Sequence, residues 1–229
     1  MFANQKALIM NKFILAILLS LNLFNINAIA QNAQKAMTDA QKSAYVDFQT
    51  NADIIRLNHL VYWGKLIDEY RQKMGYYPFA NQSKYPIYVE IATPLQQSFF
   101  NGNKPPAPAT IKSMKDFVQE LEKGLGRTID EYYDPQYAPD GKPNFYIYMI
   151  DGQDYHLAVH NFSPFSFARH IDVNYHKVEI SNIKNRTLNI ITLQELLNNN
   201  AFKKAMNKPI DKIGFFNQRE QKNLHSTKE

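Results

Sequence analysis

The chain contains no cysteine, and this absence excludes several kinds of chemistry at once. Its 229 residues carry a formal net charge of +5 and are enough for one domain or two small ones, but no disulfide can stabilise them. Thiol catalysis and zinc sites with cysteine ligands are excluded as well. Ordinary burial of apolar side chains must therefore hold the fold together, and 14 tyrosines and 15 phenylalanines supply much of that material.

The chain also lacks the common catalytic signatures. It has only 8 glycines, and it contains no glycine-rich phosphate loop, no dinucleotide-binding fingerprint, no Gly-x-Ser-x-Gly elbow and no Ser-x-x-Lys motif. Its positive charge is spread along the sequence, whereas a nucleic-acid-binding protein gathers such charge on one face or segment. These absences favour a non-catalytic protein without deciding the question, and we expect no nucleic-acid partner.

Long hydrophobic runs are missing except near the N-terminus. Lys12 precedes a short apolar run at residues 13–24, and Ala28-Ile29-Ala30 follows it. This order is typical of a secretory signal peptide cleaved after Ala30, with translation starting at Met1 or Met10. The run is too short for a usual membrane-spanning helix, although an uncleaved anchor remains an alternative.

An exported chain without cysteine fits a bacterial better than a eukaryotic origin, because small eukaryotic secreted domains usually contain disulfides. We therefore expect a periplasmic or secreted protein with no membrane span after cleavage. Residues 1–30 would be the signal peptide, residues 31–216 a single domain, and the polar residues 217–229 a disordered tail.

Helical periodicity is strongest at residues 43–74, which end before Gly75 and Pro78. A second helix is expected after Thr110 or Ser113, ending at Gly124 or Gly126, and a third after the capping box of Thr192 and Glu195, continuing to about residue 206.

Alternating β-forming residues predict strands at residues 85–93, 144–150, 155–159 and 174–180. The second and third of these strands would form a hairpin around Asp151-Gly152. The resulting fold class is α+β, with a long amphipathic helix packed on a small antiparallel sheet and additional short helices.

Two groups of short motifs carry a resemblance to a known family. LIDEY at residues 66–70 leads to GYYP at 75–78, and later Asp134-Pro135 and Asp140-Gly141 precede NFYIY at 144–148 and YHLA at 155–158. Over about residues 50–160 the chain resembles the soluble region of type II secretion pseudopilins and related type IV pilin-like proteins. The resemblance implies a spine helix followed by a β-region that can hold calcium. The prepilin cleavage motif of that family is missing, so the chain would be a released pilin-like module.

Four of the 6 histidines lie close together in the sequence, at His156, His160, His170 and His176. Neutral imidazoles bind zinc or copper. His156 and His160 have the spacing of a zinc-protease helix, but Leu157 stands in place of the catalytic glutamate, and in a strand the two lie about 13 Å apart. A zinc or copper site would need His170 or His176 from a neighbouring strand. The alternative is that all four are ordinary half-buried or surface histidines.

Aspartates flank the same hairpin and form a second candidate metal site. Calcium is bound by oxygen-rich loops, and the candidate ligands here are Asp134, Asp140, Asp151 and Asp154. Their spacing matches no EF-hand, so turn-forming aspartates in a solvated loop are the alternative.

Three phenylalanines follow the hairpin in the segment NFSPFSF. Phe162, Phe165 and Phe167 either belong to the core or form an exposed aromatic edge that contacts a partner.

Taken together, these patterns favour an exported, non-catalytic module that interacts with an unidentified protein partner or with the cell envelope. Two alternatives remain open, a metal-dependent hydrolase using the histidine-bearing hairpin and a periplasmic carrier that binds a small ligand between the long helix and the sheet.

Overall fold

The computed structural model describes residues 39–93, 108–135, 145–172 and 175–207. The expected signal peptide at residues 1–30 and the expected tail at 217–229 lie outside these residues. By its internal contacts the chain divides into two units, Met1–Asp47 and Phe48–Glu229. The sheet and the candidate site belong to the second unit.

Helix α2 (Asp39–Met74) confirms the long helix and its end, because Gly75 follows it with a φ of 84°. Within the second unit its buried positions recur with helical spacing and include Leu60, Trp63 and Ile67, each 0% exposed. No described helix is both long enough and apolar enough to cross a membrane.

Helix α4 (Met114–Leu125) begins and ends at two of the expected residues. Ser113 is its N-cap and forms a capping box with Asp116, and Gly126 ends the helix at a φ of 70°. Thr110 is instead the first residue of a short strand. Gly124 lies inside the helix, where it packs against Tyr70 of α2.

The sheet is larger than predicted and is mixed rather than antiparallel. In the described residues it has seven strands: β1 (Ile87–Ile91), β2 (Thr110–Lys112), β3 (Tyr146–Asp151), β4 (Asp154–Asn161), β5 (Arg169–Asp172), β6 (Tyr175–Ser181) and β7 (Ile190–Ile191). The order is β2-β1-β3-β4-β6-β5, with β7 beside β6. The pairs β1–β2 and β6–β7 are parallel, and the other four pairs are antiparallel.

The central hairpin is confirmed with a tight turn. Asp151 pairs with Asp154, and Gly152 between them has a φ of 59°, which favours glycine. The third predicted helix is two helices, α5 (Leu193–Asn198) and α6 (Asn200–Met206), because Asn199 has an extended backbone and caps the second one. The predicted capping box of Thr192 and Glu195 is present at the start of α5.

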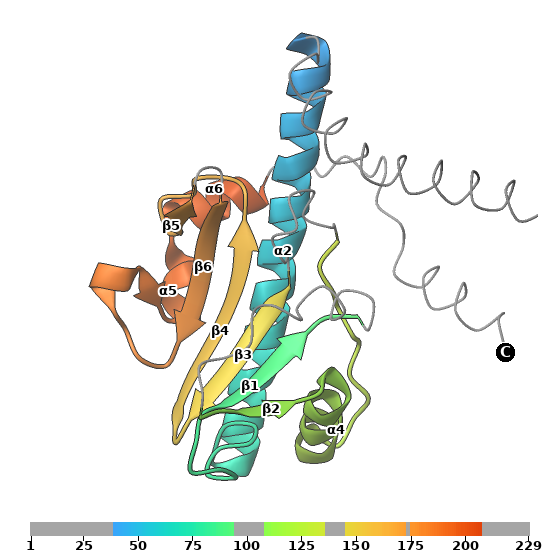
Figure 1. Ribbon diagram of the computed structural model, residues 1–229, viewed down its shortest axis with the longest axis vertical. Helices are drawn as coiled ribbons and strands as arrows, with labels where there is room; N and C mark the ends of the chain where they lie inside the picture. Colours follow the sequence, from blue (N-terminus) through green and yellow to red (C-terminus); the bar gives the residue numbers. More distant parts are fainter. Residues whose placement is uncertain (1–38, 94–107, 136–144, 173–174, 208–229) are drawn as a thin grey trace, which may run out of the picture. The chain divides into compact units, whose positions relative to one another are not determined.

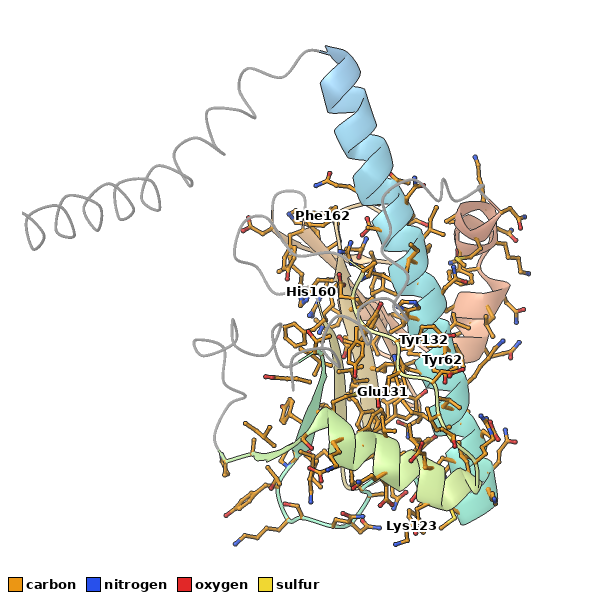
Figure 2. The ribbon with its side chains drawn as sticks, turned by 90° about the vertical axis from the view of Figure 1, so that its right-hand side faces the viewer. Tyr62, Lys123, Glu131, Tyr132, His160 and Phe162 are labelled. Atoms are coloured by element: carbon orange, nitrogen blue, oxygen red, sulfur yellow. The ribbon has the colours of Figure 1, made fainter. Side chains whose placement is uncertain are left out.

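All described helices of this unit lie on one face of the sheet, with α2 behind the strands in Figure 1 and to their right in Figure 2. The sheet residues that point toward them, such as Val89, Leu157 and Ile180, are 0% exposed and form one core with α2 and α4. The alternate residues of each strand point to the opposite face. We call this second surface, on which no described helix lies, the helix-free face; its residues include Tyr88, Ile147, Met149, His156, Ala158, His160, Arg169, Lys177 and Glu179.

Candidate functional site on the helix-free face

Strand β4 places two of the candidate histidines on the helix-free face. Tyr155, Leu157 and Val159 of this strand are buried in the core, so the alternation of side chains directs His156 and His160 to the other side. Figure 2 shows His160 on the side of the strands away from the helices. The register pairs His160 with Lys177 of β6 and Ala158 with Glu179.

His156, Glu179 and Lys177 form a charged network on this face. Nδ1 of His156 lies 2.8 Å from Oε1 of Glu179, and the Lys177 ammonium pairs with the second carboxylate oxygen. Burial would raise the pKa of Glu179, but the hydrogen bonds and charges of His156 and Lys177 outweigh it and lower that pKa to about 2. Glu179 is therefore ionised at neutral pH, and as an acceptor it fixes the hydrogen of His156 on Nδ1.

His160 lies in a different environment although it shares the same strand. Its ring stacks on Tyr175 with a centroid distance of 4.5 Å and an interplanar angle of 12°. Burial, reinforced by the positive charges of Lys177 and Arg169, lowers the pKa of His160 to about 4. Its Nδ1 is buried and has no hydrogen-bond partner among the described residues.

Arg169 completes a row of basic side chains across three strands. It pairs with Lys177 across β5 and β6, and Lys177 pairs with His160 across β6 and β4. Nε of Arg169 is buried without a hydrogen-bond partner, and no acidic residue of the described segments forms an ion pair with this guanidinium. We call Arg169, Lys177 and His160 the basic row.

The other two candidate histidines lie on the opposite face. His176 pairs with Asn161 of β4 and with His170 of β5, and the rings of His170 and His176 are 5.3 Å apart. The four histidines are thus two separate pairs. Within the described segments, no group of three or more His, Asp or Glu side chains is arranged to hold a metal ion. A zinc or copper ion on His170 and His176 would need ligands from outside those segments.

The calcium candidates are also separated. Asp134 is 6% exposed and engaged with Arg56 in the interior, whereas Asp151 and Asp154 are exposed at the hairpin turn. Asp140 lies outside the described residues. The structure therefore does not bring Asp134 together with the hairpin pair.

The three phenylalanines have different environments. Phe167 is 4% exposed and contacts Phe165 and Phe202, so it is part of the core. Phe165 is half-buried against that core. Phe162 is half-buried as well, and its ring lies 5.3 Å from the Arg56 guanidinium carbon.

Sequence reasoning missed a second polar site, which lies inside the molecule. Arg56 of α2 is 0% exposed and donates to both carboxylate oxygens of Asp134 at 2.7 and 3.0 Å and to Asp53 at 2.7 Å. Asp53 also accepts the backbone N–H groups of Phe162 and Ser163. Because its groups are engaged with one another, we assign this network to holding α2, the segment around Asp134 and the end of β4 together.

Arg169, Lys177 and Glu179 were also missed as site residues. A sequence signal for Lys177 and Glu179 was present, because they alternate with Val178 and Ile180 in a predicted strand. Their position beside His156 and His160, however, depends on the strand order of the sheet, which the sequence pattern does not specify.

Comparisons with protein-family models, with curated proteins and with solved structures gave no match.

Proposed function

We propose that this chain is an exported, non-catalytic interaction module with a pilin-like core, and that it binds a protein partner of the cell envelope through the helix-free face. One observation carries the proposal. The sheet face opposite the helices holds the basic row, in which Arg169 has no described acidic partner and buried nitrogens of Arg169 and His160 lack hydrogen bonds. Unsatisfied buried polar groups destabilise a protein, and because the Arg169 and His160 side chains are only half-buried, a small rotation can bring these nitrogens to a partner that supplies the missing acceptors.

The metal-dependent hydrolase alternative has weaker support, because the described residues bring no three metal-binding side chains together. A metal-free hydrolase using the same hairpin is also weakly supported. Ser181 pairs with His156 across the strands, and His156 in turn contacts Glu179, which resembles the order of a catalytic triad. However, the Ser181 hydroxyl donates to the Tyr155 carbonyl at 2.6 Å and is 1% exposed. A nucleophile must be accessible and must donate to its base, and Ser181 meets neither condition.

The carrier alternative requires space between the long helix and the sheet. Large side chains of the core fill that interface in the described residues, among them Trp63, Phe117 and Tyr148, each 0% exposed. Tyr148 stacks on Phe117 with a centroid distance of 4.9 Å. Close packing of this kind favours a structural role for the interface.

Photo-crosslinking in the producing cells tests the proposal. Tyr88 on β1 would be replaced by the photoreactive residue p-benzoylphenylalanine, which preserves an aromatic side chain at this half-buried position of the helix-free face. We expect a crosslinked adduct of defined mass, whose second component is then purified and shown to bind the isolated chain.

Tyr76, which follows α2 and is 36% exposed, provides the matched control because its ring contacts Tyr70 of that helix and not the helix-free face. The same substitution there should give no adduct with that partner. An adduct at Tyr76 together with none at Tyr88 would contradict the proposal.

A further inference from the structure

We infer that the basic row is a carboxylate-binding site, and that the partner presents it with an extended segment carrying acidic side chains at alternate positions. This inference rests on the proposed function, because it names the chemistry of the partner at the same face.

The charges on the face favour an anionic group beside Arg169. The Lys177 ammonium is neutralised by Glu179, whereas the Arg169 guanidinium forms no ion pair with an acidic side chain of the described residues. Arginine forms planar, paired hydrogen bonds with carboxylates, and such charge-assisted bonds are among the stronger ones in proteins. A carboxylate at this position would satisfy the buried Nε of Arg169.

His160 supplies a second polar contact at the other end of the row. Its stacking on Tyr175 fixes the plane of the ring, and its buried Nδ1 has no partner. A neutral imidazole donates one N–H, so His160 can bind a carboxylate oxygen without being protonated.

The spacing of the row matches an extended acidic segment. Neighbouring strands lie about 4.8 Å apart, so Arg169 and His160, which flank Lys177 on either side, are separated by about 10 Å. In an extended chain, alternate side chains are about 7 Å apart and point to the same side. Two flexible glutamates at alternate positions therefore span the row.

The charges of the basic row also argue against nucleic acid as the ligand. Binding a phosphate backbone requires many uncompensated lysines and arginines. Here the row has only two permanent cations and one of them is already paired with Glu179, which leaves too few for a phosphate backbone.

The inference is tested by titrating the purified, isotope-labelled protein with the peptide acetyl-Glu-Ala-Glu-Ala-Glu-amide and following the Arg169 Nε–H and His160 ring signals by NMR. We expect saturable shifts of both signals that weaken as salt is added. The corresponding lysine peptide should produce neither shift.

Two variants make the test specific to the row. Arg169→Gln should weaken binding about tenfold or more, and Arg169→Lys, which keeps the charge but loses the fork, should be intermediate. Arg127→Gln is the matched control, because Arg127 is an exposed arginine paired with Glu69 of α2 and lies outside the row. Thermal melts of all variants verify folding.

Unchanged Arg169 and His160 signals on addition of the acidic peptide would overturn the inference, as would equal affinities of the Arg169→Gln and Arg127→Gln variants. If crosslinking at Tyr88 succeeds while the peptide fails to bind, only the carboxylate chemistry is wrong. If both fail, the proposed function fails with it.

Discussion

At the scale of single residues, Arg56 is notable because its charged side chain is completely buried. Taking a guanidinium out of water is unfavourable unless its charge and its hydrogen bonds are satisfied. Asp134 and Asp53 balance the charge of Arg56 and accept its hydrogen bonds. Burial alone would lower the pKa of Arg56, but the two carboxylates outweigh that effect and raise it above its ordinary value. The sequence offered no indication of this network, because Arg56 and Asp134 are 78 positions apart and appear as ordinary charged residues.

Replacing Arg56 with methionine tests this account. The variant Arg56→Met leaves two buried carboxylates without their cation, so we expect the free energy of unfolding in urea to fall by about 3–5 kcal/mol. The control Arg127→Met breaks a pair whose side chains are each 49% exposed, and it should lower the free energy by less than about 1 kcal/mol. Equal losses in the two variants would show that the interior network does not stabilise the fold.

Two half-buried histidines predict a loss of stability on acidification. Burial lowers the pKa values of His59 and His160 to about 4, below the ordinary value of 6.5. Below pH 6.5 the unfolded chain binds protons that the folded chain does not, so stability present above that pH is lost as the pH falls toward 4. We expect a loss of up to about 3 kcal/mol for each histidine.

Urea denaturation at several pH values between 7.5 and 4.5 measures this dependence. The double variant His59→Asn/His160→Asn should have a flatter profile than the parent over the same range. Identical profiles would mean that neither histidine is responsible for the pH dependence.

At the scale of secondary-structure elements, the sequence predicted those with strong local signals. The long helix, the start and end of α4 and the β3–β4 hairpin were predictable because periodicity, caps and the Asp151-Gly152 turn lie within short windows. Strands β2, β5 and β7 were not predicted. Each has at most 4 residues, too few to show a periodic pattern, and β2 and β7 are held by parallel pairing with strands that are not their neighbours in a hairpin.

The candidate site was likewise predictable only in its local features. Alternation along one strand was enough to expect that His156 and His160 share a face, and the structure agrees. Their separation from His170 and His176 depends on the register between β4 and β6, which no local pattern of the sequence specifies.

Gly124 tests the packing between α4 and α2. A Cβ at Gly124 would lie 2.1 and 2.5 Å from two ring carbons of Tyr70, which is 1% exposed. The variant Gly124→Ala should therefore lower the free energy of unfolding by about 1–3 kcal/mol, although alanine favours helix more than glycine does.

The control is Gly64→Ala in α2, where the nearest contact is the terminal methyl carbon of Ile180 at 2.7 Å, at the flexible end of a side chain. It should be less destabilising than Gly124→Ala in the same urea experiment. The opposite order would contradict the described packing of Tyr70 on α4.

At the scale of the whole molecule, the described unit has two unlike sides. The helices cover one face of the sheet and bury the core, while the other face keeps a charged network and the basic row (Figure 1, Figure 2). Partner binding at that second face is our proposal, and export through residues 1–30 stays a prediction from the sequence. The proposal concerns what contacts the helix-free face in the cell, and the prediction concerns the compartment in which the protein lies.

The absence of cysteine allows one measurement to address both. Two single-cysteine variants would be made, one at Met149 on the helix-free face and one at the exposed Lys115 of α4. Each would be labelled with a membrane-impermeant maleimide, first in cells with a permeable outer membrane and then as purified protein. We predict that Met149→Cys reacts readily in the purified protein but slowly in cells, whereas Lys115→Cys reacts at similar rates in both. Equal rates for Met149→Cys in cells and in the purified protein would contradict a partner on the helix-free face, and an unreactive Lys115→Cys in cells would contradict export.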